Sequence, residues 1–173
     1  MKAVLISIQP KWCELIASGK KTIEVRKTRP KMETPFKVYV YMTKHKWIFK
    51  LLPFLKNRFA KVIGEFVCDD IIVDVRGENA DVFSKYAQLS LVEQKKYGAN
   101  KPLFGWHITD LKIYDKPKKL GEFKPWCEKS RKTDDNLEMC CNCKNAFSDE
   151  DGVFYGCGLT RPPQSWCYVE ELL

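Results

Sequence analysis

Short apolar stretches of strand length recur along this 173-residue chain. Period-two alternation or a brief apolar run predicts strands over 3–8, 21–27, 36–42, 61–75, 102–115 and 164–172. The fourth of these is either a pair of strands or one bent strand, with Gly64 as a bulge. Because no regular strand–helix–strand rhythm is present, the chain is predicted to be an α+β protein, a small mixed β-barrel with short peripheral helices.

Three segments between the strands predict those helices. The first starts at Pro10, which suits the first turn of a helix, and stops at Gly19. Residues 80–97 predict one or two short helices. Residues 44–60 mix aromatic and basic side chains and predict a helix with a break at Pro53.

The size and composition of the chain predict one soluble domain over 1–173. The hydrophobic fraction of 45% and the charged fraction of 30% are those of globular proteins. No window approaches the roughly 20 apolar residues that a membrane span needs. The apolar run at the N-terminus is too short for the core of a signal peptide. A cytoplasmic location without membrane contact is expected.

Positive charge is concentrated in the first third of the chain. The net charge is +8, but residues 20–61 hold thirteen Lys or Arg and only two acids, so this segment carries +11 and the remainder −3. Localised basicity of this kind indicates a protein that binds a polyanion such as RNA. The alternative is a solvated basic face with no ligand.

The stretch GKKTIEVRK, residues 19–27, is the densest part of that basic segment. Gly19 allows a sharp turn into the strand. Glu24 and Arg26 share one face of the strand and are expected to pair, and an arginine fork can also bind a phosphate or a base edge. Strict alternation puts Lys21 on the other face, so it reaches the same cleft only if it precedes the regular pleat. A purely structural Glu–Arg pair beside a solvated lysine is the alternative.

The spacing Gly19-x-Lys21-x-x-Glu24-x-Arg26 resembles the G-x-K-x-x-E-x-R signature of ASCH domains, which belong to the PUA-like superfamily of β-barrels. The closing stretch LTRPPQSWCYVEEL, 159–172, resembles a subgroup found in phages and mobile genetic elements. The likeness covers residues 1–115 and 159–173. It implies a PUA-like barrel that binds RNA or a nucleotide in a cleft beside the signature.

Aromatic and polar residues near the signature complete the predicted binding site. A single-stranded or flipped base needs a stacking surface, for which Trp12 and Trp47 are the candidates, although aromatic side chains with helical or strand spacing are more often core. The resemblance places the stretch 160–166 at the rim of the cleft; its alternative role is a rigid entry into the last strand. The full set of predicted ligand contacts is Trp12, Lys20, Lys21, Thr22, Glu24, Arg26, Trp47, Arg161, Gln164 and Ser165.

Some members of the family that the chain resembles are enzymes, and the sequence leaves this alternative open. One branch removes the acetyl group from acetylcytidine and another is described as a nuclease. The first carries a threonine nucleophile where this chain has Glu24, and a glutamate near the position of Ala87 and Gln88, so the chain departs from it. If the chain is a hydrolase, Lys21 with a depressed pKa and Glu24 as a base are the candidate catalytic residues. A third alternative is a phage-encoded module that grips a protein through the basic aromatic segment 44–61.

Cysteines cluster where hydrophobic periodicity is lost, over 116–160, and this segment is predicted to be an insertion in the domain. Disulfides are disfavoured in a reducing compartment, so metal ligation or burial are the readings for the eight cysteines. Four thiolates could hold one structural Zn²⁺. Cys141 could take the place of Cys140 as a ligand. The alternative is that the thiols are free or locally oxidised. The predicted ligands are Cys127, Cys140, Cys143 and Cys157.

Overall fold

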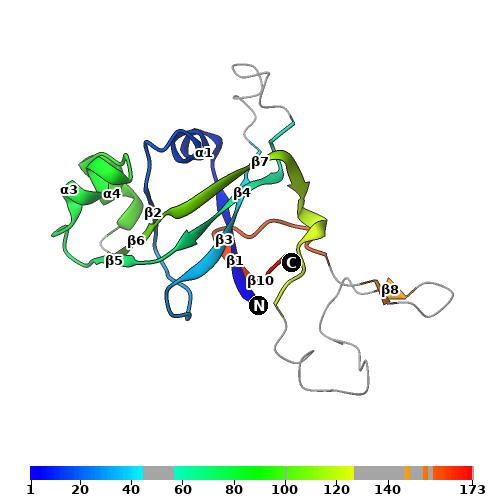
Figure 1. Cartoon of the computed structure of the whole chain (residues 1–173). Helices are drawn as coiled ribbons and strands as arrows, with labels where there is room; N and C mark the ends of the chain where they lie inside the picture. Colours follow the sequence, from blue (N-terminus) through cyan, green and yellow to red (C-terminus); the bar gives the residue numbers. More distant parts are fainter. Residues whose placement is uncertain (45–56, 100, 127–146, 149–153, 156–157, 173) are drawn as a thin grey trace.

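The computed structural model describes residues 1–44, 57–99, 101–126, 147–148, 154–155 and 158–172 (Figure 1). A five-stranded sheet has the order β10-β1-β3-β4-β7, and a three-stranded sheet has the order β2-β6-β5. The strands of the first are β1 (Lys2–Ile8), β3 (Phe36–Met42), β4 (Lys61–Cys68), β7 (Thr109–Lys119) and β10 (Trp166–Glu170). The strands of the second are β2 (Ile23–Arg26), β5 (Ile71–Asp74) and β6 (Leu103–His107).

The remaining elements lie around these sheets. A separate two-stranded ladder joins β8 (Phe147–Ser148) to β9 (Phe154–Tyr155). The helices are α1 (Pro10–Ala17), α3 (Ala80–Tyr86) and α4 (Leu91–Gly98), and a 3₁₀ turn spans Leu120–Glu122. In Figure 1, α3 and α4 group beside the three-stranded sheet, whereas α1 lies near the strands of both sheets.

The pairing confirms the predicted α+β class with mixed strands. β1 runs parallel to β3, and the other ladders within the two larger sheets are antiparallel. Among the described residues, no ladder joins the two sheets, so they enclose the core without a continuous barrel. The main core lies between the sheets and α1, and it includes Ile6, Ile16, Val38, Phe66 and Trp106.

Two segments that the sequence presents as continuous are each divided between the sheets. The segment 61–75 forms β4 in the large sheet and β5 in the small one. The prediction of one strand over 102–115 is wrong, because it comprises β6 and β7. The change occurs at Ile108, the one residue between β6 and β7, whose N–H donates to the Thr22 carbonyl. Asp110, just inside β7, has a φ of 47°. Alternation continues across such a break, so it does not reveal the change of sheet.

The predicted bulge at Gly64 is confirmed, since the pairing of β4 shifts register on both of its sides there. Residues 80–97 were predicted to form one or two short helices, and they form two, α3 and α4. The second begins with a capping box in which the Ser90 hydroxyl and the Glu93 carboxylate satisfy each other's backbone N–H groups.

The domain continues beyond the predicted start of the cysteine-rich insertion. β7 extends to Lys119, Phe123 is fully buried against Tyr39, and Pro125 bridges to Val169. Residues 116–126 are therefore part of the packed domain. The N-terminus lies beside the C-terminal strand, where the N–H of Glu171 donates to the carbonyl of Met1 at 2.7 Å (Figure 1).

Most of the predicted helix over 44–60 lies outside the described residues, and residues 57–60 form a turn. In the part of the chain that the structure describes, no helix is both long enough and apolar enough to span a membrane.

Candidate functional site

The turn between α1 and β2 places Lys21 just ahead of the regular strand. Gly19 adopts a φ of 72°, a left-handed conformation that glycine takes without a steric penalty. The N–H of Lys21 donates to the Leu15 carbonyl at 2.9 Å, so this residue is still held by the helix. β2 begins only at Ile23. Lys21 thus escapes the strict alternation, and its side chain reaches the face that carries Glu24 and Arg26.

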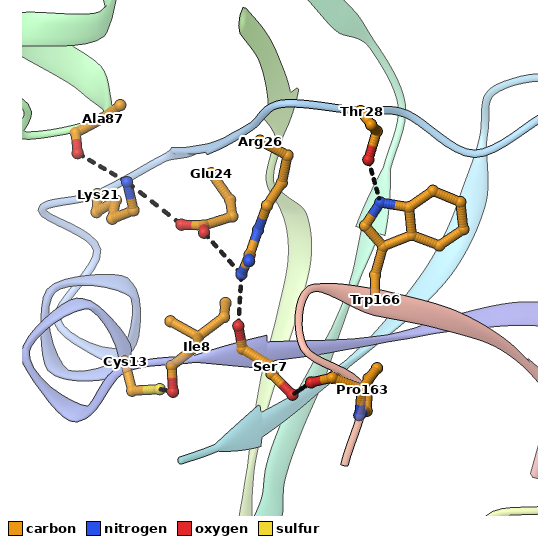
Figure 2. A network of polar contacts seen from close by, with 10 residues as sticks. All are labelled: Ser7, Ile8, Cys13, Lys21, Glu24, Arg26, Thr28, Ala87, Pro163 and Trp166. Atoms are coloured by element: carbon orange, nitrogen blue, oxygen red, sulfur yellow. Dashed lines mark hydrogen bonds and ion pairs between the residues drawn. The ribbon is translucent and has the colours of Figure 1, made fainter. Parts of the chain in front are cut away.

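Glu24 lies between the two cations (Figure 2). The Lys21 Nζ is 3.3 Å from the Glu24 Oε2, and the Arg26 Nη2 is 3.0 Å from the Glu24 Oε1. Each cation also donates to a main-chain carbonyl: Lys21 to Ala87 at 2.7 Å and Arg26 to Ser7 at 2.6 Å. We call Lys21, Glu24 and Arg26 the charged cluster. The expected pairing of Glu24 with Arg26 is confirmed.

The charged cluster is almost completely removed from solvent. The exposed fractions are 2% for Lys21, 6% for Glu24 and 7% for Arg26. Two cations and one carboxylate leave an excess of one positive charge. The Nε of Arg26 is buried and has no hydrogen-bond partner among the described residues. A buried donor without a partner costs free energy, so other interactions must offset this cost in the folded protein.

Burial lowers the pKa of Lys21, because desolvation penalises its charged form. The Glu24 carboxylate raises the pKa of Lys21 through its charge and its hydrogen bond, which partly offsets burial. The charge of the neighbouring Arg26 lowers it further. Burial also raises the pKa of Tyr97. The charge of Arg26 lowers that pKa and the charge of Glu24 raises it. The pKa of the Cys13 thiol is raised by burial and by Glu24.

The structure links the C-terminal rim to the charged cluster through Ser7. The Ser7 carbonyl accepts from Arg26, and the Ser7 hydroxyl donates to the Pro163 carbonyl at 2.7 Å (Figure 2). The N–H of Ser7 donates to the Ser165 carbonyl at 2.9 Å. Of the predicted rim contacts, Arg161 and Gln164 are exposed and Ser165 is half-buried.

Trp12 also reaches the charged cluster. The Lys21 Nζ lies 5.0 Å from the centre of the half-buried Trp12 ring, and Lys11 lies 4.3 Å from it. Lys20 is exposed on the turn before β2, and Thr22 is half-buried, held by a backbone bond to Tyr86. Trp47 lies outside the described residues.

Several contacts of the charged cluster could not be predicted from the sequence. The carbonyls of Ser7 and Ala87 are main-chain atoms from distant elements, and any residue type would supply them. Ala87 ends α3 at a position where the acetylcytidine-hydrolysing branch is expected to carry an acid, and here only its main chain faces Lys21. A lysine on α1, Lys11, is identified only by its position over Trp12.

The predicted zinc ligands, Cys127, Cys140, Cys143 and Cys157, all lie outside the described residues, so the zinc site stays a prediction. Within the described ranges, no group of three or more His, Cys, Asp or Glu residues could hold a metal ion. Cys13 and Cys68 are buried and Cys167 is half-buried, as expected for thiols that pack in the core.

The protein's stability should depend on pH through Lys21. Its pKa is lower in the folded chain than the ordinary value of 10.5, so between these two values the unfolded chain binds more protons. Stability from this group therefore rises with pH across that window and is complete above 10.5. We expect the unfolding free energy of the native protein to increase, relative to Lys21→Met, in urea titrations between pH 7 and pH 10. A difference that stays constant or falls over this range would contradict the lowered pKa.

The architecture and the charged cluster together define a small α+β protein. It has a mixed five-stranded sheet, an antiparallel three-stranded sheet and a buried Lys–Glu–Arg group. The family model for the ASCH domain matches residues 6–132, which is most of the chain. The protein therefore belongs to the ASCH domain family, a family of PUA-like fold associated with RNA binding.

Solved structures of similar fold agree with this assignment. The crystal structure of the ASCH protein from Zymomonas mobilis has a TM-score of 0.56 at 18% identity, and the alignment covers 98% of this chain and 88% of that one. Two point mutants of the same protein give TM-scores of 0.53 and 0.52, also at 18% identity. The alignments cover 99% and 98% of this chain and 92% and 89% of theirs. At this identity the likeness shows the fold alone. No curated protein matches the chain.

Proposed function

We propose that this protein binds RNA or a nucleotide over the charged cluster, with Trp12, Lys20 and the rim 161–165 as further contacts. The observation that carries the proposal is the excess positive charge of a cluster that is less than a tenth exposed. A charge held in low dielectric acts more strongly on a nearby anion than a solvated lysine does. A phosphate above the cluster would balance that charge.

The surroundings of the cluster suit a nucleic-acid ligand. Trp12 offers an aromatic ring beside Lys21, and base–aromatic stacking is a common source of affinity for single strands. Ser7 joins Arg26 to the rim through two hydrogen bonds, so a ligand over the charged cluster would also lie near the rim. The concentration of thirteen cations in residues 20–61 supplies the longer-range attraction.

The proposal is tested by the binding of a labelled single-stranded RNA to the native protein, Lys21→Ala and Lys116→Ala across a salt series. Lys116 is exposed on β7 and its loss removes the same formal charge. We expect affinity to fall with salt for all three, since phosphate contacts release counterions. Lys21→Ala should weaken binding about tenfold or more, which corresponds to about 1.4 kcal/mol, and Lys116→Ala about twofold at most.

Thermal melts establish that both variants are folded. If Lys21→Ala and Lys116→Ala bind equally, the charged cluster is not the site. If the native protein binds no RNA and no nucleotide at any salt concentration, the proposed function fails altogether.

A second candidate is a hydrolase acting on a modified nucleoside or on RNA. The observation that favours it is the lowered pKa of Lys21 with a carboxylate oxygen 3.3 Å away, since such a pair can exchange a proton with a bound substrate. Glu24 replaces the threonine nucleophile expected in the acetylcytidine-hydrolysing branch, so an activated water would have to attack. Release of acetate from acetylcytidine, or cleavage of the bound RNA, that disappears in Lys21→Ala would favour the enzyme over the binder.

A further inference from the structure

A wide depression lies at the other end of β2 from Lys21. Its volume is about 1110 Å³, and it is formed by the loop after β2 together with the starts of β5 and β6. We call it the loop groove; it does not lie over the charged cluster, because none of the three cluster residues lines it. It is lined by Lys27, Thr28, Arg29, Pro30, Lys31, Met32, Glu33, Thr34, Asp70, Ile71, Lys101, Pro102 and Phe104.

The charge of the loop groove is positive. Four cations line it, Lys27, Arg29, Lys31 and Lys101, against the two acids Glu33 and Asp70. One oxygen of Asp70 already accepts a hydrogen bond from the N–H of Ile71 at 2.8 Å. The cations of the loop itself are exposed and available to a ligand.

Contacts with β10 hold the loop in place, so the loop groove is largely preformed. The indole Nε1 of Trp166 donates to the Thr28 Oγ1 at 3.0 Å (Figure 2), and the N–H of Lys31 donates to the Tyr168 hydroxyl at 2.6 Å. The two aromatic rings pack edge to face with centres 5.3 Å apart. The Lys27 Nζ lies 4.9 Å from the centre of the Tyr97 ring. Preformed sites lose less conformational entropy when a ligand binds.

Apolar side chains also line the loop groove. Met32, Ile71 and Phe104 are half-buried and pack against the main core. Proteins that bind single-stranded nucleic acids combine cations for the phosphates with apolar and aromatic side chains for the bases. A duplex would present mainly its phosphates and would make little use of the apolar side chains.

We propose that the loop groove binds the backbone of a single-stranded RNA that also contacts the charged cluster, an inference that rests on the proposed function. Lys21 and Lys27 are six residues apart at opposite ends of β2, and at about 3.3 Å per residue this separation is at most about 20 Å. These ends are close enough for one strand of RNA to contact both the charged cluster and the loop groove. Arg29 and Lys31 supply phosphate contacts.

The test compares three proteins in the binding of a labelled single-stranded RNA of about 12 nucleotides, a length within the usual site size for such folds. They are the native chain, Arg29→Gln/Lys31→Gln and the control Lys112→Gln/Lys116→Gln. Both pairs are exposed, and the control pair lies on β7 in the other sheet. Within the described ranges, neither pair makes a side-chain hydrogen bond or ion pair. Circular dichroism melts test whether both variants are folded.

We expect the groove variant to lose about tenfold in affinity at moderate salt and to reduce the magnitude of the slope of log K against log salt by about 1.4, because each single-strand phosphate contact contributes about 0.7. The control should keep both values within error of the native ones. If the native chain binds RNA and the two double variants behave alike, the loop groove is not part of the site, although the proposed function stands. If the native chain binds no RNA, the proposed function and this inference both fail.

Discussion

Glu24→Gln should destabilise the protein by about 3–5 kcal/mol, the usual cost of removing one partner from a buried ion pair. The substitution keeps the size of the side chain but removes the one carboxylate that the two cations of the cluster share. Among the described residues, Glu24 is the only carboxylate paired with Lys21 or Arg26, so both side chains would be left buried without an ion-pair partner. Urea unfolding at neutral pH measures the effect as a lower midpoint with an unchanged slope.

Glu33→Gln is the matched control for that experiment. Glu33 is an exposed acid in the loop after β2, and surface changes of this kind usually alter stability by less than about 0.5 kcal/mol. A loss below about 1 kcal/mol for Glu24→Gln would show that water reaches the cluster in solution. The burial on which the proposed function depends would then be wrong.

Trp106→Ala should destabilise the protein by a similar amount, about 3–5 kcal/mol, through the cavity that it leaves. Trp106 has an exposed fraction of 0% and lies opposite Glu24 in the ladder between β2 and β6. Its ring packs edge-on against Phe36 at 5.8 Å and lies 6.1 Å from the ring of Trp166. The cavity would therefore open behind the charged cluster and beneath the residue that anchors the loop groove.

Trp106→Phe separates the loss of volume from the loss of a polar group. The indole Nε1 of Trp106 has no hydrogen-bond partner among the described residues, so phenylalanine removes an unsatisfied donor while it keeps much of the ring. We expect Trp106→Phe to cost clearly less than Trp106→Ala in the same urea titration. Equal losses for the two variants would show that the Nε1 makes an interaction that the cavity argument neglects.

Separate variants test the charged cluster and the loop groove, so the groove can fail as a binding site while the cluster stands. Lys21→Ala tests the charged cluster, whereas Arg29→Gln/Lys31→Gln tests the loop groove, and the two positions lie at opposite ends of β2. The stability of Glu24→Gln and Trp106→Ala tests the packing that joins them. A variant that keeps its stability and loses affinity identifies a ligand contact. A variant that loses both does not distinguish a contact from the framework behind it.

Much of the local structure was readable from the sequence because side-chain periodicity follows directly from backbone geometry. The spacing of Glu24 and Arg26 placed them on one face of a strand, and they form an ion pair at 3.0 Å. Gly19 predicted the turn after α1, and it adopts a positive φ. The G-x-K-x-x-E-x-R spacing, together with the order of the flanking elements and the closing stretch 159–172, indicated the family that the comparison then showed.

The partners of these residues were decided only by the tertiary structure. Lys21 donates to a carbonyl 66 residues away in the chain, and Ser7 to one 156 residues away. The alternation over 102–115 indicated strand residues and their faces, yet the segment crosses from one sheet to the other. Local periodicity determines which face of an element is apolar, but not which element packs against it. The burial of Lys21 and Arg26, and with it their electrostatic effect, depends on that packing.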